Sequence, residues 1–303
     1  MGKVVLIGCG NVGMSYAYSL VTSKNKVSEL VLIDVNHKKA EGEALDLQHA
    51  AVYNKTRVKI KAGNYEDCAD ANIICICAGA TQLPGETRPD LLNRNYKIMS
   101  NIVGAITKTG FKGIYLVATN PVDVMTYTVL RLSGAKPNKV IGSGTTLDTS
   151  RLRHLIGEVT SIHPKNIHSY VIGEHGDTSM VPWSCSFIGL NKVDQFLTEE
   201  QCSQIVKQVR NSAYEIIERK GSTYYGIGIC LQDITEAILE DSGEIKTVSS
   251  YSKEHDTYFG MPSILSKRGI VRTLGLDMRP IEREKLDKSI KAIKDMCNDI
   301  NFE

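Results

Sequence analysis

One short stretch of the chain holds the side chain best suited to move a proton near neutral pH. Residues 172–177 read IGEHGD, so His175 lies among glycines whose backbone a small ligand can approach closely. Imidazole is the only side chain whose ordinary pKa allows it to donate and accept a proton near neutrality. A single histidine is more often a surface or core residue, so this stretch predicts catalysis only if other residues support it.

Two charged residues in a predicted helix could assist such a histidine. Asp148 and Arg151 are three positions apart in the sequence LDTSRLR at residues 147–153, which places them on one face of the helix. Arginine suits the recognition of a planar carboxylate through two parallel hydrogen bonds. An aspartate close to His175 would fix the tautomer of the imidazole and stabilise its protonated form. The alternative, from these residues alone, is an ordinary ion pair on the surface.

A glycine-rich turn near the start of the chain predicts a dinucleotide-binding site. Gly8, Gly10 and Gly13 form the pattern G-x-G-x-x-G between an apolar strand and a helix, and Asp34 ends the next apolar strand. The glycines permit a tight turn, close approach of a pyrophosphate to the backbone, and packing of the helix on the sheet. Asp34 would accept hydrogen bonds from the adenosine ribose and repel a 2′-phosphate, which favours NAD over NADP. The alternative is a structural turn and an exposed acid.

A polar, glycine-rich loop at residues 79–88 could close over a bound ligand. The loop follows a buried strand, and ligands bind at the carboxyl ends of strands in a doubly wound sheet. Arg88 at the end of the loop could polarise a substrate carbonyl once the loop closes. The alternative is a solvated loop without a role in catalysis.

The elements that must position these residues alternate between apolar strands and helices in the first half of the chain. Near-continuous apolar runs are typical of a parallel sheet covered on both faces. The sequence therefore predicts a Rossmann-type doubly wound α/β domain over residues 1–143. Longer helices and short strands favour an α+β substrate-binding and catalytic domain over residues 144–303, packed tightly against the first with a cleft between them. The expected strands are 4–7, 30–33, 57–62, 72–78, 113–118, 140–141, 245–251 and 269–273, and the expected helices are 14–21, 38–50, 90–108, 122–132, 147–158, 199–220, 223–239 and 281–297.

Composition and charge argue against several classes of function. The chain has 303 residues, of which 42% are hydrophobic and 23% charged, and its net charge of +2 argues against nucleic-acid binding. Apolar runs stay well short of the ~20 residues that span a bilayer, and the first strand begins too early for a signal peptide. The eight cysteines are scattered without a Cys-x-x-Cys pair. We therefore expect reduced thiols in a cytoplasmic protein, no disulfide framework and no metal site.

Six motifs resemble those of the lactate and malate dehydrogenase family, and within it those of the bacterial L-lactate dehydrogenases. They cover essentially the whole chain and keep the order and spacing of the family. The motifs are residues 8–13, 78–88, 118–123, 147–153, 172–177 and 220–226. The resemblance implies an NAD-dependent enzyme that interconverts pyruvate and L-lactate.

The resemblance also implies roles for individual residues. His175 would be the proton donor and acceptor, and Asp148 would orient its ring. Arg151 would bind the substrate carboxylate, and Arg88 would polarise the ketone. The implied contacts to NAD are Gly8, Gly10, Val12, Gly13, Asp34, Lys39, Tyr65, Gly79, Ala80, Ala118, Thr119, Asn120 and Ser143.

Three further residues are implied to contact the substrate. Asn120 would lie between the nicotinamide and the substrate, and Thr223 would line the pocket. Malate dehydrogenases of this family place an arginine at the position of Gln82, where it neutralises a second carboxylate. An uncharged glutamine would leave the extra charge of oxaloacetate unpaired, at a cost of several kcal/mol. Gln82 therefore favours lactate over malate.

Some positions depart from the family pattern and keep alternatives open. After Asp177 the chain reads TSMVPW, where lactate dehydrogenases more usually have an acid followed by proline, valine and tryptophan, and Pro89 replaces a common leucine. An L-2-hydroxyisocaproate-type dehydrogenase, which reduces bulkier 2-keto acids, is the first alternative, and a malate dehydrogenase is the second. A catalytically silent NAD-binding protein is the third, although it would have no reason to keep all the catalytic residues.

Arg153 and His168 match positions at which many bacterial lactate dehydrogenases bind fructose 1,6-bisphosphate across a subunit interface. Two cations beside a two-fold axis would suit a doubly phosphorylated effector. The resemblance favours a homotetramer, and the chain lacks the N-terminal arm by which vertebrate relatives hold theirs, so the effector would also act on assembly. The alternative is that both residues are simple polar groups of an interface.

Overall fold

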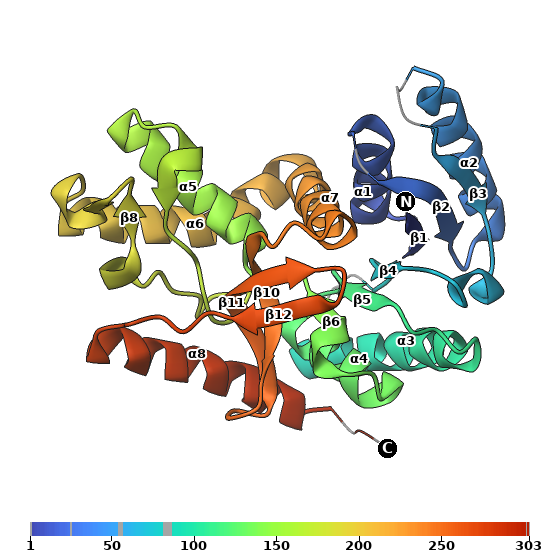
Figure 1. The fold of residues 1–303 in the computed structure, drawn as a ribbon. Coiled ribbons are helices and arrows are strands. Elements are labelled where there is room, and N and C mark those ends of the chain that lie inside the picture. Colours follow the sequence, from blue (N-terminus) through green and yellow to red (C-terminus); the bar gives the residue numbers. More distant parts are fainter. Residues whose placement is uncertain (1, 25, 54–56, 81–86, 301, 303) are drawn as a thin grey trace.

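The computed structural model describes residues 2–24, 26–53, 57–80, 87–300 and 302, apart from the side chain of Arg88. Its main feature is one nine-stranded sheet with helices on both faces (Figure 1). The strands are β1 (Gly2–Ile7), β2 (Val27–Ile33), β3 (Lys59–Ala62), β4 (Ile73–Ile76), β5 (Ile114–Val117), β6 (Val140–Gly142), β7 (Ile167–His168), β8 (Phe187–Ile188), β9 (Asn191–Lys192), β10 (Ile245–Ser252), β11 (Thr257–Ser266) and β12 (Gly269–Thr273). The helices are α1 (Asn11–Thr22), α2 (His37–Ala51), α3 (Arg88–Lys108), α4 (Val122–Ser133), α5 (Thr146–Thr160), α6 (Glu199–Lys220), α7 (Tyr225–Glu240) and α8 (Pro280–Asn298).

The first six strands form the doubly wound parallel sheet that the sequence predicts. Their order is β6-β5-β4-β1-β2-β3, and each neighbouring pair is parallel. The strand order reverses between β1 and β4, so the loops after these strands diverge to opposite faces of the sheet. Ligands of such folds bind in the crevice at this point, beside the carboxyl ends of the strands.

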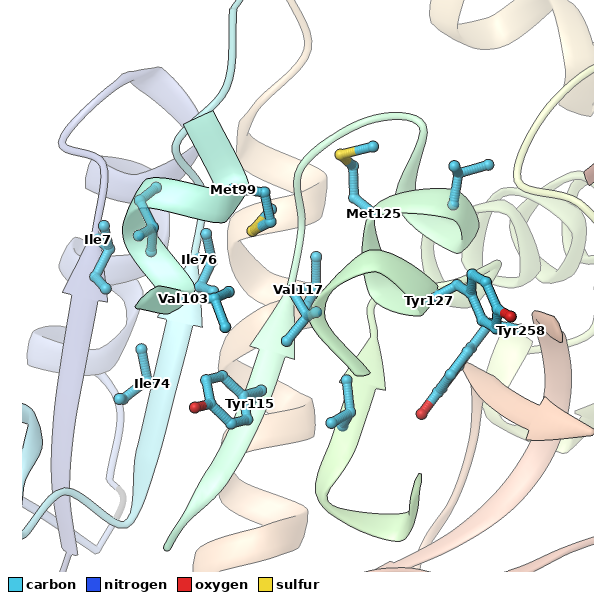
Figure 2. Close-up of a cluster of buried hydrophobic side chains, with 14 of the residues drawn as sticks. Ile7, Ile74, Ile76, Met99, Val103, Tyr115, Val117, Met125, Tyr127 and Tyr258 are labelled. Atoms are coloured by element: carbon cyan, nitrogen blue, oxygen red, sulfur yellow. The ribbon is translucent and has the colours of Figure 1, made fainter. Parts of the chain in front are cut away.

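The strand residues alternate between two hydrophobic layers, which explains why the runs are apolar at every position. On β4, Ile74 and Ile76 face one layer, whereas Ile73 and Cys75 face the other. The first layer is filled by side chains of α3 and α4 (Figure 2) and of α8. The second layer is filled by side chains of α1, α2 and α7. A sheet covered on both faces in this way fixes the loops at its carboxyl edge.

The second half of the chain extends the same sheet. β10 pairs antiparallel with β6 through Ser249 and Gly142, and β11 and β12 follow as antiparallel neighbours. The strands β7, β8 and β9 form a separate small sheet. One continuous sheet therefore crosses the boundary placed after residue 143, and the division into two domains remains an interpretation.

In the second half, the strands β8, β9 and β11 were not predicted, and one helix begins later than expected. β11 was not predicted, because Gly260 and Pro262 interrupt a pattern that otherwise suits a strand, and both residues are usually found outside strand interiors. The helix expected from residue 223 begins at Tyr225, so that Thr223 belongs to the turn between α6 and α7.

Three observations concern the described part of the chain as a whole. None of its helices has the length and apolar character needed to cross a membrane. The described residues also contain no group of three histidine, cysteine or acidic side chains arranged to hold a metal ion. All eight cysteines are free thiols.

Candidate active site

Three of the predicted catalytic residues meet in one place. His175 Nδ1 lies 2.6 Å from Asp148 Oδ2, and Arg151 Nη1 donates a hydrogen bond to Asp148 Oδ1 at 3.0 Å. The side chain of Asp148 is only 11% exposed and that of Arg151 13%, so the two are not an ordinary surface ion pair. Because Asp148 contacts Nδ1, the proton that His175 could exchange with a ligand is the one on Nε2.

The charges in this group determine the protonation of His175. The Asp148 carboxylate raises the pKa of His175 to about 9, against the opposing effect of desolvation. Burial alone would raise the pKa of Asp148, but His175 and Arg151 together lower it below its ordinary value. At neutral pH the imidazole is therefore protonated and the carboxylate ionised, which is the state that can donate a proton to a ligand.

Hydrogen bonds between neighbouring elements place α5 beside the His175 segment. The Thr145 hydroxyl donates to the backbone carbonyl of Val171 at 2.6 Å, just before α5 begins. The Gly173 N–H donates to the Gly260 carbonyl on β11 at 2.9 Å. Gly173 has φ +88°, and a Cβ there would lie 2.5 Å from Ser289 Oγ on α8, so this position requires glycine.

A buried acid also contacts this segment. It belongs to the motif at residues 118–123, but nothing in the sequence alone indicated a role for it. Asp123, at the start of α4, accepts a hydrogen bond from the backbone N–H of His175 at 2.8 Å. The Ser249 hydroxyl on β10 donates to the other carboxylate oxygen. No sequence signal distinguished Asp123, because its partners lie 52 and 126 residues away.

The glycine turn after β1 has the geometry of a phosphate cradle. Gly8 has φ +100°, and a Cβ at Gly13 would lie 2.0 Å from the Gly8 carbonyl oxygen. A Cβ at Gly10, in contrast, would meet no atom within 4 Å, so the space beside it is open. Helix α1 begins at Asn11 without a side-chain cap, which leaves the N–H groups of its first turn available to an anion. These residues fit the pyrophosphate of a dinucleotide.

Asp34 lies directly after β2, as the sequence predicts. Its Oδ2 accepts the N–H of Cys9 at 2.8 Å, and its Oδ1 accepts the N–H of Asn36 at 2.9 Å. Each carboxylate oxygen can accept further hydrogen bonds, so Asp34 fixes the glycine turn and can still receive ribose hydroxyls. Lys39 follows in the first turn of α2, where its N–H donates to Asn36 Oδ1 at 3.1 Å.

The loops after β4 and β5 are joined through a residue that the sequence reasoning missed. Asn95 on α3 is 2% exposed; its Oδ1 accepts the N–H of Ala80 at 2.8 Å, and its Nδ2 donates to the Asn120 carbonyl at 3.0 Å. A Cβ at Gly79 would lie 2.7 Å from Thr119 Cγ2, so these loops pack closely. Of the other predicted NAD contacts, Val12 lies in α1, Tyr65 begins a short 3-10 helix after β3, and Ala118 and Ser143 directly follow β5 and β6.

Two predicted substrate contacts lie outside the described residues. These are Gln82 and the side chain of Arg88, whose backbone begins α3. Thr223 lies in the turn between α6 and α7, and the neighbouring Ser222 hydroxyl accepts a hydrogen bond from Asn11 Nδ2 at 3.2 Å. The turn that contains Thr223 therefore lies beside the glycine turn after β1.

The two residues predicted to bind an effector lie close together on α5 and β7. Arg153 Nε donates to the Ser169 carbonyl at 3.1 Å, and its guanidinium lies 5.0 Å from the centre of the Tyr170 ring. His168 directly precedes Ser169 and is exposed.

Comparisons with known proteins agree over nearly the whole chain. Residues 2–142 match the model of the lactate/malate dehydrogenase NAD-binding domain, and residues 145–302 match the alpha/beta C-terminal domain of the same family. The chain is 44% identical to L-lactate dehydrogenase 2 of Bacillus cereus and 45% identical to L-lactate dehydrogenase 1 of Bacillus anthracis, with 97% of each chain covered.

Solved structures similar to this chain belong to proteins of the same kind. A lactate dehydrogenase from a Medee basin deep-sea metagenome library superposes with a TM-score of 0.95 at 41% identity, covering 98% of both chains. The minor L-lactate dehydrogenase of Enterococcus mundtii superposes with a TM-score of 0.96 in its ligand-bound form, at 39% identity over 100% of this chain and 99% of that one. The chain therefore belongs to the lactate/malate dehydrogenase family and has NAD as its cofactor.

Proposed function

We propose that the chain catalyses the NAD-dependent interconversion of pyruvate and L-lactate, with His175 exchanging the proton. The observation that carries this proposal is the 2.6 Å contact between His175 Nδ1 and Asp148 Oδ2, with Arg151 on the second carboxylate oxygen. The similar proteins named above are L-lactate dehydrogenases, which supports lactate as the substrate.

In the reducing direction, protonated His175 donates its Nε2 proton to the ketone oxygen. The Asp148 carboxylate stabilises the imidazolium before the transfer and keeps Nε2 directed away from itself, toward the substrate. In the oxidising direction, neutral His175 accepts the hydroxyl proton of lactate. NADH, when bound, supplies the hydride that reduces the carbonyl carbon.

Arginines would bind and polarise the substrate. Arg151 uses one of its five N–H donors on Asp148, so the remaining donors can bind a substrate carboxylate through two parallel bonds. From the family resemblance, Arg88 would polarise the ketone, and Gln82 would leave a second carboxylate unpaired. Asn120 and Thr223 would complete the substrate contacts. The two cations close to the developing oxyanion, Arg88 and protonated His175, would stabilise it most strongly where water is excluded.

NAD would bind across the carboxyl edge of the parallel strands. The first-turn N–H groups of α1 would receive the pyrophosphate, and the open space beside Gly10 would admit it. Asp34 would accept the adenosine ribose hydroxyls and repel a 2′-phosphate.

Regulation and assembly form the second part of the proposal. Fructose 1,6-bisphosphate would bind Arg153 and His168 where two subunits of a homotetramer meet. The exposure of His168 and its position next to the backbone group that Arg153 contacts support this site. Exposed apolar side chains on neighbouring helices, Tyr18, Leu45 and Ile229, support association with a second copy.

Initial rates of NADH oxidation test the substrate directly. The rates are compared for pyruvate, oxaloacetate and 2-ketoisocaproate, each with and without fructose 1,6-bisphosphate. We expect pyruvate to be preferred, with a lower KM in the presence of the bisphosphate. Preference for 2-ketoisocaproate would favour the L-2-hydroxyisocaproate-type alternative, and preference for oxaloacetate would contradict the role of Gln82. An unchanged KM and unchanged assembly with the bisphosphate would overturn the Arg153 and His168 site.

A further inference from the structure

The buried carboxylate of Asp123 joins three segments of the chain at the catalytic histidine. Asp123 is the second residue of α4 and is 2% exposed. Its Oδ2 accepts the N–H of His175 at 2.8 Å, and its Oδ1 accepts the hydroxyl of Ser249 on β10. Asn120, which is proposed to contact the substrate, precedes α4 by two residues. One side chain thus connects the Asn120 loop, the His175 segment and the inner strand β10.

An ionisable group in this position is costly, which indicates that it has a use. Burial raises the pKa of Asp123 to about 6, although the hydrogen bonds from Ser249 and from the His175 backbone oppose this rise. Above that pH the group is ionised with little access to water, a state that proteins tolerate only with hydrogen-bond partners or nearby positive charge. The start of α4 and the imidazolium of His175 provide such charge.

The His175 segment needs an external anchor because of its own sequence. Gly173 adopts φ +88°, and Gly176 is exposed, so the backbone on both sides of His175 has little intrinsic preference for one conformation. Asp148 contacts the ring, and the neighbouring backbone N–H groups of Gly173 and Glu174 are bound by Gly260 and Ser289, which leaves the N–H of His175 itself to Asp123. Asp123 accepts the backbone N–H of His175. The backbone of His175 is therefore held by Asp123 and its ring by Asp148.

We propose that Asp123 is a positioning residue, whose carboxylate fixes the backbone of His175 so that the imidazole reaches both Asp148 and the substrate. This inference rests on the proposed role of His175 as the proton donor. Asp123 touches no reacting atom itself. It acts through the distance and direction of proton transfer, to which rates are very sensitive.

The test compares two substitutions of Asp123 with a matched control. Asp123→Ala removes both hydrogen bonds, whereas Asp123→Asn keeps an oxygen for the His175 N–H and an amide that can donate to the Ser249 hydroxyl. The control is Glu282→Ala, because Glu282 is also buried and its carboxylate likewise accepts a backbone N–H and a serine hydroxyl, both from Ser184. For each protein, kcat and KM for pyruvate, the NADH Kd, the pH profile and the Tm are measured.

We expect Asp123→Ala to lower kcat by about 10- to 100-fold while the NADH Kd stays within about twofold, since displacement of the catalytic group acts on the chemical step. Glu282→Ala should lower the Tm without changing kcat. Folded Asp123→Ala with unchanged kcat would overturn the proposal, and so would an equal loss of kcat in Glu282→Ala.

Asp123→Asn decides the question if Asp123→Ala does not fold. The charged groups that act on the pKa of His175 are Asp148 and Asp123, which raise it, and Arg151, which lowers it; Glu174 acts on Asp123. The neutral amide keeps the geometry and removes one negative charge. We therefore expect kcat within about threefold of the unsubstituted protein and an alkaline limb of the pH profile at lower pH. An alkaline limb at the same pH as in the unsubstituted protein would overturn the proposal. A kcat lowered by about tenfold or more would also overturn it, because this variant keeps both hydrogen bonds.

The same measurements separate this inference from the proposed function. If the unsubstituted protein does not oxidise NADH with any 2-keto acid, or if His175→Gln leaves the rate unchanged, the proposed function fails. If the unsubstituted protein is active, His175→Gln is inactive and the Asp123 variants match the unsubstituted protein, only the inference about Asp123 fails.

Discussion

At the scale of single residues, the proposed reaction requires His175 to carry a proton when a ketone is reduced and to lack one when an alcohol is oxidised. Asp148 raises the pKa of His175 to about 9, so the imidazole loses its proton as the pH rises through that value. We expect kcat/KM for pyruvate reduction to be flat at neutral pH and to fall above pH ~9. Lactate oxidation should rise over the same range. Initial rates across the pH range, with saturating cofactor, measure both limbs.

The Asp148→Asn substitution tests whether the Asp148 carboxylate is what raises the pKa of His175. Removing the carboxylate charge removes the largest influence that raises the pKa of His175, so the alkaline limb should move to lower pH. The rate at neutral pH should also fall by about 100-fold, because the ring loses its orientation. Asp287→Asn, an exposed acid on α8, should leave rate and profile unchanged. An Asp148→Asn profile that coincides with that of Asp287→Asn would contradict this account.

Asp34 should determine the choice between the two nicotinamide cofactors. Its carboxylate oxygens accept the N–H groups of Cys9 and Asn36, so the charge is fixed where the adenosine ribose is expected. We expect Asp34→Asn to raise the ratio of kcat/KM with NADPH to that with NADH by about tenfold, since loss of one charge repulsion is worth about 1.4 kcal/mol. The ratio is measured at fixed pyruvate. A ratio that does not rise would show that the Asp34 charge does not discriminate.

At the scale of elements, two glycines of the same turn should respond differently to alanine. A Cβ at Gly13 would lie 2.0 Å from the Gly8 carbonyl oxygen, so Gly13→Ala must displace α1 from the sheet. A Cβ at Gly10 would meet no atom within 4 Å and only reduce the space beside the uncapped helix start. We expect Gly13→Ala to lower the Tm by several degrees and Gly10→Ala to keep the Tm but weaken NADH binding about tenfold or more. Thermal unfolding and NADH fluorescence titration distinguish the two, and equal effects would contradict the assignment.

The elements of the first half were largely predictable because the inner strands of a doubly covered sheet, such as β4 and β5, are continuous apolar runs. The predicted helix 199–220 coincides with α6, and the doubly wound sheet was confirmed. β11 escaped prediction because it is stabilised by pairing on both sides despite Gly260 and Pro262. Local patterns cannot show such tertiary support.

The candidate site was predictable where its residues are of a reactive type within a motif. His175, Asp148 and Arg151 were named from the sequence, and the structure brings them together. Asp123 and Asn95 were not assigned roles, because only their hydrogen bonds to other segments of the chain distinguish them. A buried acid or amide looks like any other polar residue until its partners are known.

At the scale of the whole molecule, apolar side chains remain exposed on helices that lie beside one another. α1 contacts both α2 and α7, and the three helices stand together on one side of the sheet (Figure 1). Tyr18 on α1 is 56% exposed, Leu45 on α2 54% and Ile229 on α7 56%. Single exposed apolar residues are ordinary, but a group on neighbouring helices indicates an interaction surface. The proposed homotetramer, with a dimer as its minimal unit, would cover it.

We expect sedimentation velocity to show a particle heavier than the single 33.4 kDa chain. The double substitution Leu45→Lys and Ile229→Lys should convert it largely to monomer, because each buried lysine would leave an unpaired charge at the interface. Both residues are exposed within one chain, so the fold and its circular dichroism should be retained. Val271→Lys, on the edge strand β12 and likewise exposed, is the matched control and should keep the mass unchanged. If the double variant sediments like the unsubstituted protein, the subunits meet through another surface.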